Sequence, residues 1–258
     1  MANWAGATGF LAVAAATSLA WGKTLWYCNE RSDAFRRGLF FVISLTHARS
    51  TAVQSLLLSA TYYTFGFLAA GLFGTIFRVP VPSLFSWSRF SWPLLLLGVI
   101  GEISLAGLLV ELGCRIPTHT GPEQLAEEIS EIPWIKGIEQ LPAVVVPVLA
   151  AMGGALEELF FRGVLLAAMI DRYHFNAPIA IAITTALFCV QQVLQVRTPT
   201  QALLMSWSCV SISVIGGLLV VLTGNVAVSM LCHASFALFW VGRSLNTSAF
   251  MNRRMNIR

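Results

Sequence analysis

The chain has few charged residues for its size. Of its 258 residues, only 11% are Asp, Glu, Lys or Arg, whereas 57% are hydrophobic. Soluble domains carry about 25% charged residues. The shortage of charge therefore excludes an ordinary soluble domain and predicts an integral membrane protein. The hydrophobic runs use nearly the whole length, which leaves room for a single membrane domain.

Several short motifs are also missing. The five cysteines form no CxxC pair and no Cys/His ligand spacing, and no HExxH occurs. A disulfide framework, a structural zinc site and a zincin-type site are therefore not expected. The start, Met-Ala-Asn-Trp, lacks a basic n-region, so the first hydrophobic run is expected to remain as a helix. The net charge of +4 comes from basic residues at segment ends, and no nucleic-acid partner is predicted.

The hydrophobic runs are long enough to cross a bilayer as helices, for which about 20 apolar residues suffice. Between them, Lys23–Arg37 is polar, Gly38–Ser50 is expected to be an interfacial or broken segment, and Arg115–Leu141 is expected to hold a short amphipathic surface helix. The predicted fold class is all-α, a polytopic transmembrane bundle of about seven spans: Trp4–Trp21, Thr51–Phe77, Pro93–Cys114, Ala143–Ile170, Ala177–Val196, Ala202–Gly224 and Val226–Val241.

The positive charges predict the orientation of these spans. Of the 16 Lys and Arg residues, twelve fall on the side of the C-terminus, three fall on the side of the N-terminus, and Arg162 lies within a span. Cytoplasmic loops are enriched in Lys and Arg. We therefore expect the N-terminus outside and the C-terminus in the cytoplasm, in the plasma (inner) membrane.

One span contains an unusual cluster of charge. The segment Gly153–Gly163 reads G-G-A-L-E-E-L-F-F-R-G and places Glu157, Glu158 and Arg162 in an otherwise apolar run. A charge near the centre of a transmembrane helix costs roughly 2.5–3.5 kcal/mol on insertion scales. These three side chains must therefore be paired or must line a hydrated cavity, and a membrane-embedded polar cavity is expected.

Helix geometry predicts how the three charges are arranged. Glu158 and Arg162 are four residues apart, so they share a face and can form an ion pair. Glu157 lies about 100° round the helix from Glu158 and has no partner on its own helix. Such a carboxylate is a candidate general base or metal ligand. The alternative is that all three charges only determine how the helices pack.

Two further polar groups occur in the later spans. On the fifth, Phe188 is followed by Gln191, Gln192 and Gln195, and on the seventh Asn225, Ser229 and His233 recur at four-residue intervals. His233 is the only histidine well inside a predicted span. The alternative is that the side chains of either group only form hydrogen bonds between helices.

Together these motifs resemble the CPBP family of intramembrane endopeptidases, which comprises the type II CAAX prenyl endopeptidases and bacterial relatives linked to bacteriocin processing and self-immunity. The family pattern is E-E-x-x-x-R, then F-x-x-x-H, then H-x-x-x-N. The resemblance covers about Val144–Val241. It implies N-terminal membrane helices and an acidic amphipathic loop in residues 1–142, a catalytic helix core in residues 143–244 and a basic cytoplasmic tail in residues 245–258.

The resemblance also assigns roles to individual residues. It implies that Glu157 is the catalytic glutamate that activates water, with Glu158 and Arg162 as its supporting neighbours. Phe188 matches the second motif, but Gln192 stands at its histidine position. His233 matches the third motif as an oxyanion donor, but Ala237 stands at its asparagine position.

These departures change the expected chemistry. Gln192 can orient a water or donate to an oxyanion, but it cannot take a proton. The missing asparagine removes an oxyanion donor, which typically costs about 10²–10³ in rate. Ser229 or Asn225, on the stripe of His233, is a candidate replacement.

No cofactor is expected. A catalytic zinc uses three protein ligands and a water, and Glu157 and His233 are the only plausible ligands here. Although many relatives are labelled metalloproteases, a metal-free, glutamate-type mechanism is favoured.

Three functions follow as hypotheses. The first is an intramembrane peptidase, a hydrolase that cleaves a membrane-associated or lipid-anchored protein near its terminus. The second is a degenerate relative that binds such peptides without cutting them and acts as a scaffold, immunity or regulatory factor. The third is a small transporter or channel with Glu102, Glu157 and His233 as a proton path, although no inverted repeat supports it.

Overall fold

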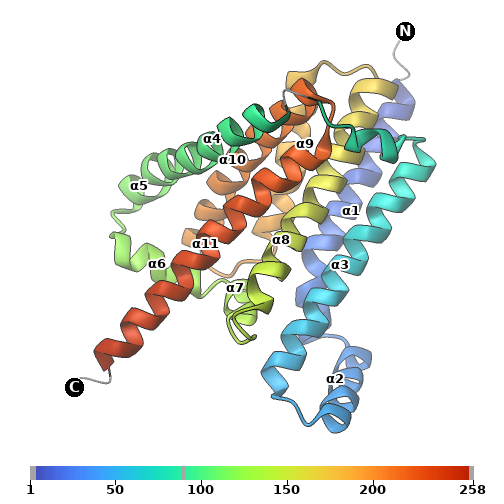
Figure 1. The fold of residues 1–258 in the computed structure, drawn as a ribbon. Coiled ribbons are helices and arrows are strands. Elements are labelled where there is room, and N and C mark those ends of the chain that lie inside the picture. The colour runs from blue at the N-terminus through green and yellow to red at the C-terminus, as the bar shows by residue number, and fades with distance from the viewer. Residues whose placement is uncertain (1–3, 89–90, 256–258) are drawn as a thin grey trace.

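The protein is a bundle of helices, shown in Figure 1. The computed structural model describes residues 4–88 and 91–255, with side chains described for 6–88 and 91–241. No strand occurs in these ranges, which confirms the all-α fold class. The helices are α1 (Trp4–Glu30), α2 (Asp33–Thr46), α3 (Ser50–Ile76), η1 (Val81–Phe85), α4 (Ser91–Val110), η2 (Glu111–Arg115), α5 (Ile116–Thr118), α6 (Pro122–Ser130), α7 (Pro133–Ile138), α8 (Val145–Glu158), η3 (Leu159–Leu165), η4 (Ala168–Arg172), α9 (Ala177–Val193), α10 (Pro199–Thr223) and α11 (Val226–Met255).

Each of the seven predicted hydrophobic runs contains a helix. Three helical segments, Ser50–Ile76, Ser91–Thr118 and Pro199–Thr223, are long and apolar enough to cross a membrane by length and composition. Two further apolar helices, Ala177–Val193 and Val226–Val241, are shorter. These segments make the protein an integral membrane protein, while the number of crossings stays a prediction.

The helix ends differ from the sequence expectation at two places. The segment Lys23–Arg37, expected to be a polar connection, is mostly helical, because α1 continues to Glu30 and α2 begins at Asp33. The hydroxyl of Ser32 accepts a hydrogen bond from the backbone N–H of Phe35 and so caps α2. Polarity by itself does not end a helix; the cap decides where the next one starts.

The second difference concerns the C-terminus. Helix α11 continues to Met255, through most of the predicted tail of residues 245–258. The side chains of this tail, including its arginines, lie outside the described residues, as does Arg89 of the predicted topology.

The expected amphipathic helix in the acidic stretch is present as α6. Its Leu125 and Ile129 are buried, and they pack with Ile132 against Val110 and Leu204. The alternation of acidic and apolar residues therefore does place a polar face outward and an apolar face against the bundle.

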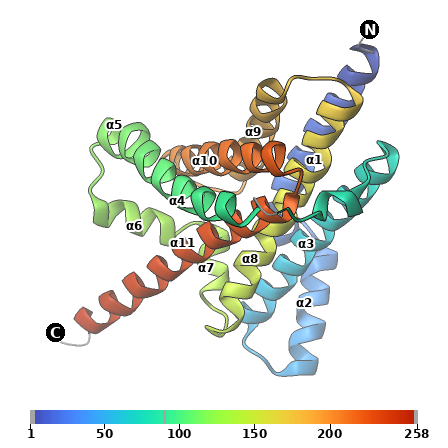
Figure 2. The same ribbon diagram turned by 45° about the horizontal axis from the view of Figure 1, so that its top comes forward.

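The helix that carries the charged cluster lies in the centre of the bundle. Figure 1 shows α8 between α3 and α11, and α8 contacts both. In Figure 2, α4, α10 and α11 form one side of the bundle, and α1 and α3 form the other. Helix α9 joins the two sides, since it contacts α1 and α10. Residues far apart in the sequence thus meet around the end of α8.

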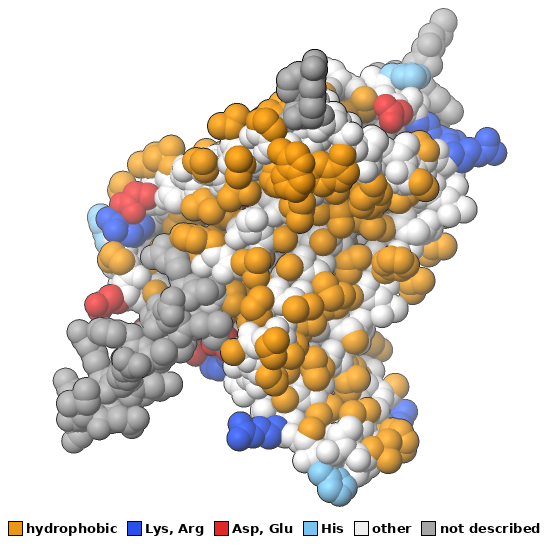
Figure 3. All heavy atoms as spheres, in the orientation of Figure 1, with side chains coloured by type: hydrophobic (Ala, Val, Ile, Leu, Met, Phe, Trp, Pro, Cys, Tyr) orange, Lys and Arg blue, Asp and Glu red, His pale blue; other side chains and the backbone are white. Residues whose placement is uncertain are grey.

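Apolar side chains dominate the outer surface. Large hydrophobic residues such as Leu68 on α3 and Leu97 on α4 are well exposed. Figure 3 shows apolar side chains spread over the visible face, with Lys, Arg, Asp and Glu toward its margins. This distribution suits a surface in contact with lipid acyl chains.

We expect Leu97→Lys to reduce membrane insertion, because it places a charge on the lipid-facing side of α4 at a cost of roughly 2.5–3.5 kcal/mol. The amount of protein in the membrane fraction measures the effect. Glu123→Lys, on the exposed face of α6, is the matched control and should insert normally. Equal insertion of both variants would contradict a lipid-facing position for Leu97.

Candidate functional site

The charged cluster lies where the helix changes its winding. Glu157 and Glu158 are the last two residues of α8, and Arg162 lies in the π-helical segment η3 that continues it. Single π turns within α-helices occur frequently at functional sites. Glu157 is 6% exposed, and Glu158 and Arg162 are fully buried. All three charges are therefore held inside the bundle.

Glu158 and Arg162 form the ion pair that their spacing predicts. Nη1 of Arg162 lies 3.0 Å from Oε1 of Glu158. Nη2 of Arg162 donates to the hydroxyl of Ser213 on α10, at 2.5 Å. The guanidinium also lies over the ring of Phe188, 4.6 Å from its centroid. The phenylalanine of the second motif therefore supports the arginine of the first, through a cation–π contact.

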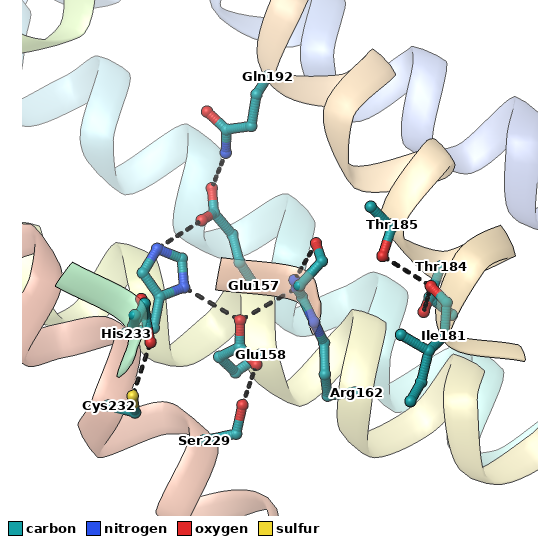
Figure 4. A network of polar contacts seen from close by, with 12 residues as sticks. Glu157, Glu158, Arg162, Ile181, Thr184, Thr185, Gln192, Ser229, Cys232 and His233 are labelled. Atoms are coloured by element: carbon teal, nitrogen blue, oxygen red, sulfur yellow. Dashed lines mark hydrogen bonds and ion pairs between the residues drawn. The ribbon is translucent and has the colours of Figure 1, made fainter. Parts of the chain in front are cut away.

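Helix α11 supplies two further partners to Glu158. The hydroxyl of Ser229 donates to Oε2, and Nδ1 of His233 lies 3.1 Å from Oε1. Figure 4 shows Arg162, Ser229 and His233 converging on this one carboxylate. Glu158 is thus fully engaged and orients the imidazole ring.

Gly216 on α10 leaves the space for this carboxylate. A Cβ at that position would lie 2.5 Å from the hydroxyl of Ser229 and 2.9 Å from Oε2 of Glu158. Both distances are shorter than a normal contact, so a larger residue would push Glu158 and Ser229 apart.

Glu157 has partners that its own helix does not reveal. Its Oε1 accepts hydrogen bonds from the hydroxyl of Tyr62 on α3 and from Nε2 of Gln192 on α9, the second at 2.6 Å. Its Oε2 lies 3.8 Å from Nε2 of His233. These partners come from α3, α9 and α11 and none comes from α8, so the spacing along α8 could not indicate them.

The sequence does not indicate Tyr62 as part of the site, and it gives Gln191 only the general role of a hydrogen bond between helices. Tyr62 is buried, and its hydroxyl accepts a hydrogen bond from Nε2 of Gln191 at 2.6 Å. The only signal in the sequence is a tyrosine hydroxyl within a hydrophobic run, which does not say where the ring points.

A cavity of about 500 Å³ adjoins these residues. Glu157, Gln192 and His233 all line it. It also reaches the α6–α7 segment, where the exposed residues Glu131 and Lys136 line it. Binding pockets for organic ligands measure about 300–1,000 Å³. The cavity is therefore large enough for several residues of an extended peptide.

The two candidate replacements for the missing asparagine do not line this cavity. Ser229 donates to Glu158, and Oδ1 of Asn225 accepts from the backbone N–H of Ala227 at 2.8 Å, at the start of α11. Ala237 does line the cavity, so a methyl group occupies the position where the family pattern has a carboxamide. Neither Ser229 nor Asn225 replaces that donor.

Glu102 is a separate buried carboxylate. Its Oε2 accepts a hydrogen bond from the thiol of Cys232 at 2.6 Å, and Glu102 does not line the cavity. A proton path through Glu102, Glu157 and His233, required by the transporter hypothesis, gains no support from this arrangement.

The residues of the site do not fit a zinc ion. Within the part of the chain that the structure describes, no group of three or more His, Cys, Asp or Glu side chains could hold a metal ion. The second carboxylate, Glu158, is occupied by Arg162 and Ser229. A catalytic zinc needs three protein ligands, which this donor set does not supply.

Residues 139–239 match the family model described as "Type II CAAX prenyl endopeptidase Rce1-like". This stretch contains Glu157, Glu158, Arg162, Phe188 and His233. The matched stretch is therefore similar to that family of endopeptidases. The match confirms the family that the motifs indicate, and residues 1–138, including Tyr62, lie outside it. Comparisons with curated proteins and with solved structures found no match.

We expect Arg162→Leu to lower the free energy of unfolding by about 3–5 kcal/mol, because it leaves the buried carboxylate of Glu158 without its cation. Unfolding of the purified protein in detergent measures the change. The double variant Glu158→Gln/Arg162→Leu should recover much of the loss, since both charges are then absent. Equal stability of Arg162→Leu and wild type would show that the pair does not stabilise the fold.

Proposed function

We propose that the protein is an intramembrane peptidase that hydrolyses a membrane-associated or lipid-anchored protein near its terminus. The similarity of residues 139–239 to the endopeptidase family supports the reaction class. The observation that carries the proposal is the placement of Glu157 and His233 on one cavity, with Oε2 and Nε2 3.8 Å apart. Hydrolysis of a peptide bond requires a base that activates water and a donor that stabilises the oxyanion. Glu157 and His233 are close enough to act as this base and this donor on one substrate.

In the proposed mechanism, Glu157 is the general base. Its Oε2 takes a proton from a water molecule, and the water oxygen attacks the carbonyl carbon of the substrate. His233 as imidazolium donates from both ring nitrogens, from Nδ1 to Glu158 and from Nε2 to the oxyanion. Glu157 then returns the proton to the leaving amine as the peptide bond breaks. Every proton is thereby accounted for without a metal.

Gln192 is proposed to orient the base. Its Nε2 donates to Oε1 of Glu157, which leaves Oε2 toward His233. The amide cannot take up a proton, so it does not replace the histidine of the family pattern as an acid–base group. We propose a glutamate-type reaction without a cofactor, in keeping with the poor fit of the donor set to zinc.

The shape of the cavity supports entry from one side of the membrane. Its exposed residues come from the α6–α7 segment and from Arg197 after α9, which the distribution of positive charges predicts to be cytoplasmic. We propose that the substrate enters from the cytoplasm, in the plasma (inner) membrane, with lipid around the bundle. This orientation keeps the N-terminus outside and the C-terminus inside.

Glu157→Gln should lower kcat by about 10²–10⁴-fold, because an amide cannot accept the proton from water. Comparative proteomics of membrane-protein termini in wild-type and Glu157→Gln cells identifies the substrate, and cleavage of that substrate by the purified proteins measures the loss in kcat. The exposed carboxylate Glu127 provides the control Glu127→Gln, which should process normally. Unchanged termini in the Glu157→Gln cells would remove the peptidase proposal.

A second candidate is a membrane protein that binds such peptides without cutting them. The specific observation in its favour is that Gln192 and Ala237 both line the cavity at positions where the family pattern has histidine and asparagine. The cavity would then act as a binding site for a scaffold, immunity or regulatory function.

Gln192→His separates the two candidates. For a peptidase that has adapted to glutamine, cleavage by the purified variant should change by less than about tenfold. For a binding protein, cleavage should appear only in the variant, because a proton acceptor contributes on the order of 10²-fold or more. Robust cleavage by the wild type would exclude the non-cleaving function.

A further inference from the structure

The hydroxyl of Tyr62 links Glu157 to the N-terminal helices. It donates to Oε1 of Glu157 and accepts from Nε2 of Gln191. Tyr62 is 7% exposed, and it lies outside the residues that match the family. Because this hydroxyl donates to a carboxylate and also accepts from an amide, two hydrogen bonds determine its position.

Helix α1 holds this tyrosine from behind. The indole of Trp21 donates to the backbone carbonyl of Tyr62 at 3.1 Å, and the two rings pack with centroids 5.1 Å apart. The next residue, Gly22, lets α1 approach α9 at Gln191, because a Cβ there would lie 2.6 Å from the carbonyl oxygen of Gln191. Tyr62 and Gln191 are therefore positioned by the same helix.

Gln191 and Gln192 act on Glu157 by different routes. Gln192 donates directly to Oε1, whereas Gln191 donates to the phenol that itself donates to Oε1. Both donors thus reach the same oxygen, and Oε2 is left facing Nε2 of His233. Rotation of the carboxylate would break both hydrogen bonds at once.

We infer that Tyr62, held by Gln191, is a positioning residue that keeps Oε2 of Glu157 directed at the substrate water. The inference rests on the proposed peptidase function. Tyr62 acts through the hydrogen bond to Glu157, and its side chain also borders the cavity. Rotation of the Glu157 carboxylate leaves the binding of substrate in the cavity unchanged. The loss therefore falls on the chemical step and lowers kcat.

Tyr62→Phe removes only the hydroxyl and should lower kcat by on the order of 10²-fold while KM stays within about twofold. Cleavage of the substrate peptide by purified protein measures both constants. Tyr63→Phe is the matched control, because its hydroxyl donates to the backbone carbonyl of Leu149 and not to Glu157. The control should retain the wild-type kcat.

A double-mutant cycle tests whether Gln191 acts through Tyr62. Gln191→Met should lower kcat, and Tyr62→Phe/Gln191→Met should be no slower than Tyr62→Phe, because the second change removes a partner that is already lost. Losses that multiply in the double variant would overturn this coupling. A wild-type kcat in Tyr62→Phe would overturn the inference, even where Glu157→Gln is inactive.

A spectroscopic measurement tests the contact without activity. The chain has only four tyrosines, so protein labelled with ¹³C at the phenol carbon shows few signals, and Tyr62→Phe assigns one of them. Glu157→Gln should shift the Tyr62 signal, because the carboxylate acceptor is replaced by an amide, and Glu127→Gln should not. An unmoved Tyr62 signal in Glu157→Gln would overturn the inference by itself. A wild type that cleaves nothing would remove the proposed function, and with it the catalytic role of Tyr62, and would leave only the contact between Tyr62 and Glu157.

Discussion

The buried ion pair between Glu158 and Arg162 is the interaction on which the rest of the site depends. Two charges in the middle of an apolar helix are costly unless each neutralises the other. Here the pair also collects partners from three other helices, Ser213 on α10, Phe188 on α9, and Ser229 with His233 on α11. The contacts that compensate the charges of Glu158 and Arg162 therefore also connect α9, α10 and α11 to the charged helix, and they orient the imidazole of His233.

Glu157 differs from its neighbour in the kind of partner it has. No Arg or Lys pairs with it among the described residues, and its Oε1 accepts from the neutral donors Tyr62 and Gln192. Neutral donors orient a carboxylate without cancelling its charge. One carboxylate of the pair thus serves the structure, while the other lines the cavity as a candidate base.

The N-terminal helices are part of the site although the family match does not include them. On α1, Trp21 donates to the backbone of Tyr62, and Gly22 allows close approach to Gln191. Gln191 donates to the hydroxyl of Tyr62, which donates to Glu157. The hydrogen-bond partners of Glu157 therefore come both from residues 1–142, which were predicted to be a separate N-terminal part, and from the predicted catalytic core of residues 143–244. A segment that contributes little recognisable sequence signal still determines the geometry around the charged cluster.

By itself, the sequence determined the helical membrane class, the hydrophobic runs and the pair Glu158/Arg162, because composition and four-residue spacing are local properties of the chain. It also indicated the peptidase family through residues on three helices. Only the tertiary structure decided that Tyr62 reaches Glu157, that Asn225 caps α11 and that Ser229 belongs to Glu158. The reason is that the direction of a side chain on one helix says nothing about which helix faces it, and that choice is made by packing across the whole bundle.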